Sequence, residues 1–129
     1  MATEILVNDG GAPARILPFI ASHAISGGEL CISHTDGKLQ KATSAASNWL
    51  GVALTDAAAD GPVNLITGRG VILNVFVSGA ANIGAQLETG AGSGVLVAGA
   101  TAGKKVAIAL AAGPGGSDVA LTKVLMVGG

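Results

Sequence analysis

Short hydrophobic runs recur along this chain, separated by turns rich in glycine, proline and aspartate. Within several runs large apolar residues alternate with polar or small ones, which is the period of a strand with one buried face. No stretch keeps a helical period over about 11 residues. A spacing of about 8–12 residues between strands predicts an all-β domain, a small β-barrel or sandwich. The predicted strands are residues 29–33, 38–42, 49–54, 62–67, 71–77, 86–88, 95–97, 104–111 and 119–127.

The clearest local signal is the Asp36-Gly37 dipeptide between residues 29–33 and 38–42. An Asp-Gly turn between two β-prone runs is typical of a hairpin, because glycine accepts a positive φ without steric cost. Residues 56–61 are rich in alanine, and a helical turn is the alternative there. Such a turn is too short to be stable without tertiary contacts.

The N-terminal segment differs from the rest, and we divide the chain into an extended arm, residues 1–22, and a β-rich domain, residues 23–129. Pro18 has no N–H, so the second apolar run of the arm cannot be a regular central strand. A disordered tail is the alternative, but such tails are poor in large apolar residues. We predict that the arm becomes ordered against a partner, by adding to a sheet edge through main-chain hydrogen bonds. The candidate partner-binding residues are Glu4, Ile5, Leu6, Val7, Arg15, Ile16, Leu17 and Phe19.

Composition changes the picture in one respect. Hydrophobic residues make up 50% of the chain, but charged residues only 12%. A monomer of this size needs more polar covering, so we predict that copies of the chain associate with one another. The net charge of −1 and the scattered Lys and Arg residues argue against binding to nucleic acid or to an anionic membrane surface.

Two further features bear on where the protein is found. The longest uncharged run, residues 70–87, is interrupted by Asn74 and Ser78, so no membrane-spanning helix is expected. The N-terminus lacks the basic region of a secretory signal. Cys31 is the single cysteine, which excludes an intrachain disulfide and fits synthesis in a reducing cytoplasm.

No motif for catalysis is recognisable, and we predict that the protein is not an enzyme and has no cofactor. Three residues separate Gly99 from Gly103, whereas a P-loop requires four. His23, His34 and Cys31 are the only nitrogen or sulfur ligands, too few for a structural zinc site, so no metal residues are expected. A small enzyme that joins a histidine to two carboxylates in a pocket is the remaining enzymatic alternative.

The chain as a whole resembles the small decoration, or cement, proteins of tailed-phage capsids. The likeness lies in loose glycine and aliphatic spacing rather than in a chemical signature. It covers the arm and most of the domain, through residues 25–30, 36–39, 50–54, 61–70 and 103–111.

This resemblance implies a β-tulip or β-barrel-like domain that forms homotrimers on the outer capsid surface of the virion. It also implies an arm that reaches across subunits of the major capsid protein, in particles made in the host bacterial cytoplasm. Such a role needs contact area and complementary shape rather than catalysis. The alternative is a β-domain of a virion fibre or a carbohydrate-binding module, for which Trp49, Phe19 and Phe76 offer few aromatic platforms.

Overall fold

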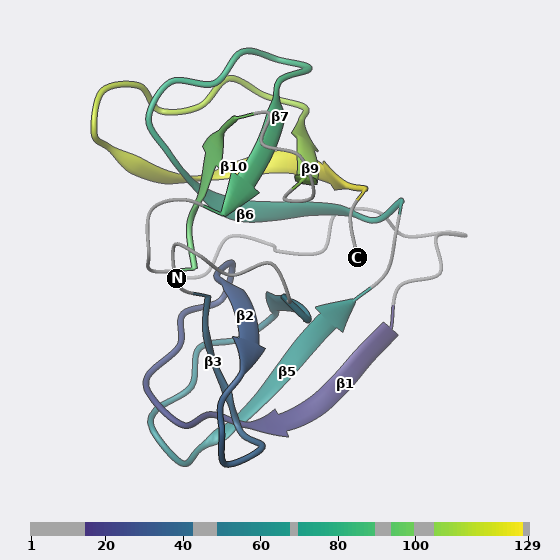
Figure 1. The fold of residues 1–129 in the computed structure, drawn as a ribbon, viewed down its shortest axis with the longest axis vertical. Helices are drawn as coiled ribbons and strands as arrows, with labels where there is room; N and C mark the ends of the chain where they lie inside the picture. Colours follow the sequence, from purple (N-terminus) through teal and green to yellow (C-terminus); the bar gives the residue numbers. More distant parts are fainter. Residues whose placement is uncertain (1–14, 43–48, 68–69, 90–93, 100–104, 128–129) are drawn as a thin grey trace.

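The computed structural model describes residues 15–42, 49–67, 70–89, 94–99 and 105–127, which form ten strands and no helix. They make two sheets, one above the other in Figure 1, and the predicted all-β fold is confirmed. The first sheet consists of β1 (Arg15–Ile20), β2 (Leu30–Ser33), β3 (Leu39–Lys41), β4 (Gly51–Ala53) and β5 (Pro62–Thr67). The second consists of β6 (Ile72–Ser78), β7 (Gln86–Thr89), β8 (Leu96–Ala98), β9 (Lys105–Ala109) and β10 (Val119–Met126).

The first sheet has the order β1-β5-β4-β2-β3, and every pairing in it is antiparallel. β1 and β3 are therefore its edges. The chain that leaves β1 returns to β3, because Ala21 forms an isolated bridge with Leu39 and the Ser22 N–H donates to the Leu39 carbonyl at 2.8 Å. This contact draws the two edges together at one end of the sheet.

The second sheet is a closed barrel of order β10-β6-β8-β7-β9, in which β10 pairs with both β6 and β9. Figure 1 shows β6 and β10 along the side of the barrel that is turned toward the first sheet. β6 alternates as its sequence predicts, with Leu73, Val75 and Val77 buried and the residues between them partly exposed. Closure of the barrel removes its open edges, which protects these short strands from pairing with other chains.

Two groups of buried side chains form the core. The larger group joins the sheets, since Leu30, Val52 and Ile66 of the first pack with residues such as Leu73 and Leu87 of the second. The smaller group lies on the face of the first sheet that points away from the barrel. It includes Ile25, Cys31, Leu39, Val63 and Leu65. The first sheet is therefore buried on both faces over its central strands.

Main-chain hydrogen bonds also join the two sheets. The Gly94 N–H donates to the Ala42 carbonyl at 2.9 Å, and the Gly94 carbonyl accepts from the Leu30 N–H at 2.8 Å. On the barrel side the Phe76 N–H donates to the Gly28 carbonyl at 3.0 Å. The segment before β8 and the β6 strand are thus bonded directly to the β2–β3 hairpin and to the residues that precede it.

The local predictions for the hairpin and for residues 56–61 have different outcomes. The hairpin is confirmed, because β2 pairs with β3 from Cys31↔Lys41 to Ser33↔Leu39. Residues 56–61 form no helical turn. Ile25 and Ala57 exchange two main-chain hydrogen bonds of 2.9 and 2.8 Å, which engage backbone groups that a helix would use.

Candidate binding surface

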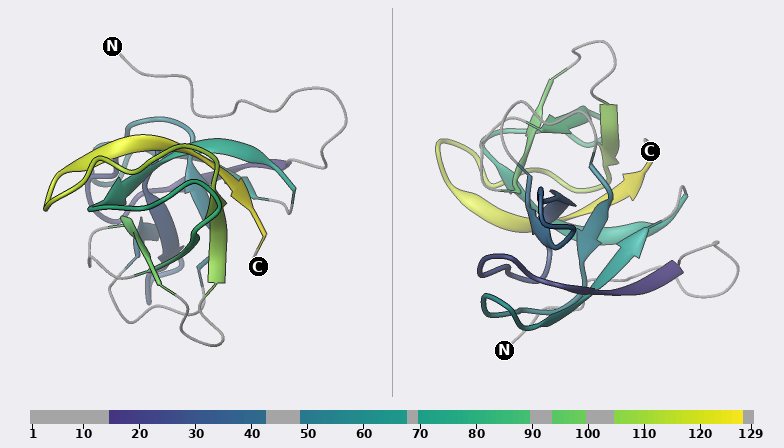
Figure 2. Two further views of the ribbon diagram at one scale, coloured as in Figure 1. Left: turned by 90° about the horizontal axis from the view of Figure 1, so that it is seen from above. Right: turned by 60° about the horizontal axis from the view of Figure 1, so that its bottom comes forward.

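The second half of the predicted arm is β1, which pairs with β5 along its whole length. The right panel of Figure 2 shows β1 along the outer margin of the sheet beside β5. Residues 15–20 are therefore extended, but they are ordered by the chain's own sheet, whereas the sequence predicted order from a partner. Of the other candidate residues, Glu4, Ile5, Leu6 and Val7 lie outside the described residues.

The direction of the Pro18 main chain explains why a proline is tolerated in β1. Ala21 donates to the Gly61 carbonyl at 2.9 Å, and hydrogen-bonded pairs alternate along an antiparallel ladder, so the Pro18↔Asn64 pair is a non-hydrogen-bonded one. The Asn64 carbonyl accordingly accepts from the Leu54 N–H on the opposite side, at 2.8 Å. An N–H at position 18 would therefore point to the free edge of the sheet. Proline lacks this N–H, and no hydrogen bond to β5 is lost as a result.

That position matters for the predicted strand addition. A strand added outside β1 would find no donor at the centre of this edge, and proline on an edge is a known protection against unwanted pairing. Side-chain burial, rather than an added main-chain ladder, is the stronger source of binding that β1 offers.

Four side chains of β1 are apolar and exposed, and we call them the β1 patch: Ile16, Pro18 and Ile20 on one face of the strand and Leu17 on the other. The exposed fractions of Ile16, Leu17 and Ile20 are 50%, 39% and 43%. Large apolar side chains that are exposed next to one another mark interaction surfaces, whereas single ones are ordinary. Arg15 is also exposed, but Phe19 is partly buried against the smaller core group and so contributes to folding.

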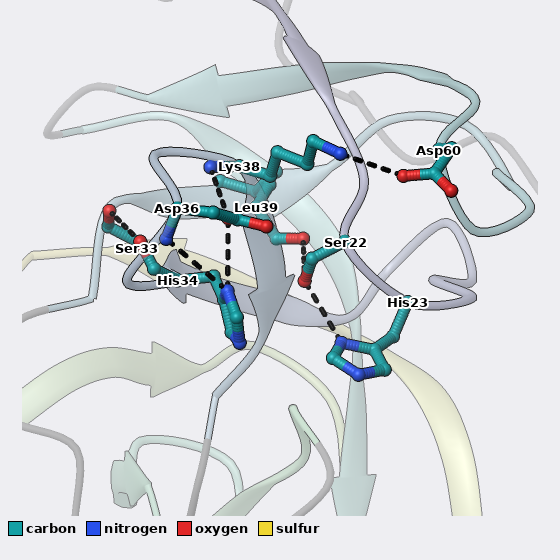
Figure 3. Close-up of polar contacts among 8 residues, drawn as sticks. All are labelled: Ser22, His23, Ser33, His34, Asp36, Lys38, Leu39 and Asp60. Carbon is teal, nitrogen blue, oxygen red and sulfur yellow. Dashed lines mark hydrogen bonds and ion pairs between the residues drawn. The ribbon is translucent and has the colours of Figure 1, made fainter.

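A polar cluster lies where the chain leaves β1 and meets the β2–β3 turn (Figure 3). Lys38 pairs with Asp60 at 2.8 Å, and this carboxylate raises the pKa of the Lys38 ammonium. The Lys38 backbone N–H donates to Asp36 at 2.9 Å and lowers the pKa of that carboxyl. These groups are exposed, so their pairing contributes little to stability.

The same cluster contains both histidines, whose rings meet edge to face with centroids 5.6 Å apart. Sequence reasoning placed His34 beside a turn and left His23 unassigned, because only closure of the sheet end brings them together. Across the described ranges, no group of three or more His, Cys, Asp or Glu is arranged to hold a metal ion.

Cys31 lies fully buried on β2, as its apolar neighbours predict. Burial, together with the charge of Glu29, raises its pKa from 9.0 to about 12.

We expect the native thiol of Cys31 to resist a thiol reagent at pH 8 while the unfolded chain reacts, as followed by absorbance with and without denaturant. Between pH 9 and 12 the folded state keeps a proton that the unfolded state releases, so this thiol makes stability fall as pH rises. Rapid labelling of the native protein would contradict the buried position.

Comparison with solved structures reveals a likeness in fold. No family model matches the chain, and no curated protein matches it. A solved structure, described as the head fiber gp8.5 N base in bacteriophage phi29, superimposes with a TM-score of 0.67 at 14% identity. The match covers 88% of this chain and 93% of that one. At this identity the likeness establishes a shared fold.

No helix among the described residues is long and apolar enough to cross a membrane.

Proposed function

We propose that this chain is a structural protein of a tailed-phage head, which binds the outer capsid surface and cements neighbouring subunits of the major capsid protein. The fold that it shares with the base of a phage head fibre supports this role, as does its resemblance to decoration proteins. The observation that most favours it is the β1 patch, an exposed apolar surface on an edge strand.

The physical basis is burial of this patch against a preformed shell. Apolar area removed from water stabilises a complex by about 25 cal/mol per Å² before the costs of association. The strand is already held by β5, so its backbone loses little conformational freedom when it binds. Residues 1–14 precede β1 in the sequence, and we propose that Glu4, Ile5, Leu6 and Val7 continue the contact across a neighbouring capsid subunit.

Homotrimer formation is part of the proposal. The low charge of the chain supports it. A trimer carries three β1 patches. Binding through several of them at once raises its apparent affinity for the capsid without new contacts. Light scattering of the free protein gives the test, with the mass of three chains as the expected result.

A second candidate role is the base of a head fibre, which the structural likeness favours specifically. A base and a cement protein would both contact the head, but a base would also hold a fibre on its outer side. Electron microscopy of decorated shells separates the two, since a cement protein bridges neighbouring capsid subunits and a fibre base need not.

Substituting Ile16, Leu17 and Ile20 together with serine tests the role of the β1 patch. We expect binding to undecorated shells to weaken at least tenfold, because three exposed apolar side chains no longer leave water on binding. The measurement is co-sedimentation with shells, combined with circular dichroism to verify folding.

The matched control substitutes Ile83 and Val119 with serine, since these side chains are 72% and 50% exposed but lie outside the patch. The control should bind normally. Normal binding by the triple variant, or equal loss in the control, would refute the β1 patch as the capsid contact. Deletion of residues 1–14 tests the remainder of the arm, and it leaves β1 in place to cover β5.

A further inference from the structure

The two histidines of the polar cluster have a feature that the capsid role does not explain. Each ring places Nδ1 against a fixed partner within its own segment of chain. His23 Nδ1 lies 3.0 Å from Ser22 Oγ, and His34 Nδ1 lies 3.0 Å from Asp36 Oδ1. In Figure 3 the other nitrogen of each ring lies at the lower edge of that ring, away from these contacts.

The hydrogen bonds of Ser22 determine the tautomer of His23. The Ser22 hydroxyl donates its one proton to the Leu39 carbonyl at 3.1 Å. Toward His23 the same oxygen can therefore only accept, so the imidazole Nδ1 must be the donor. A neutral imidazole with a proton on Nδ1 presents a lone pair at Nε2.

The carboxylate of Asp36 does the same for His34. An ionised carboxylate only accepts, so the 3.0 Å contact requires a proton on His34 Nδ1. The Asp36 N–H also approaches this nitrogen, but at 3.5 Å, and the shorter charge-assisted contact prevails. His34 therefore also presents its lone pair at Nε2.

This arrangement is the one that metal-binding histidines use. Their second nitrogen donates to a carboxylate or another oxygen, which orients the ring and makes the ligating nitrogen more basic. The spacing is also suitable: two imidazoles at about 2.0–2.1 Å from a tetrahedral ion have their centroids roughly 5 Å apart. The observed separation is 5.6 Å, and the rings must turn about their Cβ–ring bonds for both Nε2 atoms to face one ion.

We propose that His23 and His34 together bind one divalent transition-metal ion through their Nε2 atoms. Water completes the coordination, since the described residues offer no third ligand at this place. Imidazole ligands suit Zn²⁺, Cu²⁺ and Ni²⁺, and Cu²⁺ binds most tightly of these to a given site. The Lys38 ammonium does not oppose the ion, because Asp60 lies 2.8 Å from it.

Metal binding would crosslink the end of the first sheet at which β1 and β3 meet. His23 follows the residues that bridge β1 to β3, and His34 begins the β2–β3 turn. An ion held between them would crosslink these segments beside the Ser22–Leu39 hydrogen bond. The folded state is then stabilised in proportion to the logarithm of the free ion concentration.

Titration of the full-length protein with CuCl₂, NiCl₂ or ZnCl₂ at pH 7.5, followed by calorimetry, tests the proposal. We expect one ion per chain, tightest for Cu²⁺, and a higher melting temperature with the ion present. His23→Gln and His34→Gln should each weaken binding at least tenfold. Asp36→Asn should weaken it by about 10–100-fold, since a neutral amide replaces the charged acceptor that orients His34.

Asp118→Asn is the matched control, because it makes the same change at an exposed carboxylate just before β10, outside this cluster, and it should bind normally. Absence of binding by the unaltered protein would overturn the proposal. Equal binding by the double His23→Gln, His34→Gln variant would also overturn it, as would a loss that follows only one of the two histidines.

Discussion

Substituting Gly94 with alanine is expected to lower the free energy of unfolding by about 3 kcal/mol. The residue has a φ of +73°, which costs an L-residue about 1–2 kcal/mol. A Cβ at this position would lie 2.9 Å from the Leu30 carbonyl oxygen and from Glu29 Cβ, and 3.1 Å from Lys41 Cβ. These atoms are backbone or attached directly to it, so they cannot move aside, and overpacking adds about 1–3 kcal/mol.

The consequence extends beyond one turn, because Gly94 accepts from Leu30 and donates to Ala42 at the junction of the two sheets. Gly37→Ala is the matched control. Its φ is +83°, yet nothing lies within 4 Å of the added Cβ, so only the conformational cost of about 1 kcal/mol should remain. Urea unfolding of both variants measures the difference. Equal losses would show that Gly94 is not tightly packed against the hairpin.

Substituting Leu65 with alanine is expected to cost about 3 kcal/mol of stability. Its side chain is 1% exposed and belongs to the smaller core group. Removal of a buried leucine side chain loses transfer free energy and leaves a cavity, which together cost about 2–5 kcal/mol. For a domain whose total stability is about 5–15 kcal/mol, that loss is large.

Leu17 is the direct cross-strand partner of Leu65 and provides the control. It is 39% exposed, so Leu17→Ala should cost less than about 1 kcal/mol. Thermal unfolding followed by circular dichroism distinguishes the two. A cost at Leu17 equal to that at Leu65 would indicate that β1 is needed for folding as much as the central strands, and would weaken its assignment as a binding surface.

The fold class and most of the strands were predictable from the sequence for a local reason. In β6, and in β5 from Pro62 to Leu65, every second side chain is buried, and the backbone itself imposes this period of two. The β2–β3 hairpin was predictable because Asp36-Gly37 supplies the positive φ that its turn needs. Residues 56–61 were harder, since so short an alanine-rich run is not a stable helix on its own and the distant Ile25 decides its conformation.

The candidate site was predictable only in part. Pro18 argued against a regular central strand at residues 15–20, and β1 is an edge strand. The partner that orders it could not be deduced, because pairing with β5 depends on a contact between segments more than 40 residues apart. The register of that pairing also decides that the backbone nitrogen of Pro18 faces the outer edge and not β5. Local sequence does not specify this register.

The sequence by itself determined a β-rich chain with little charge, an apolar N-terminal region and a buried Cys31, because these follow from composition and from the period of a strand. Only the tertiary structure decided that residues 15–20 complete the chain's own sheet and leave Ile16, Leu17 and Ile20 exposed. It alone also brought His23 to His34. Both depend on how distant strands close a sheet, and long-range pairing is set by the balance of the whole core rather than by any local run of residues.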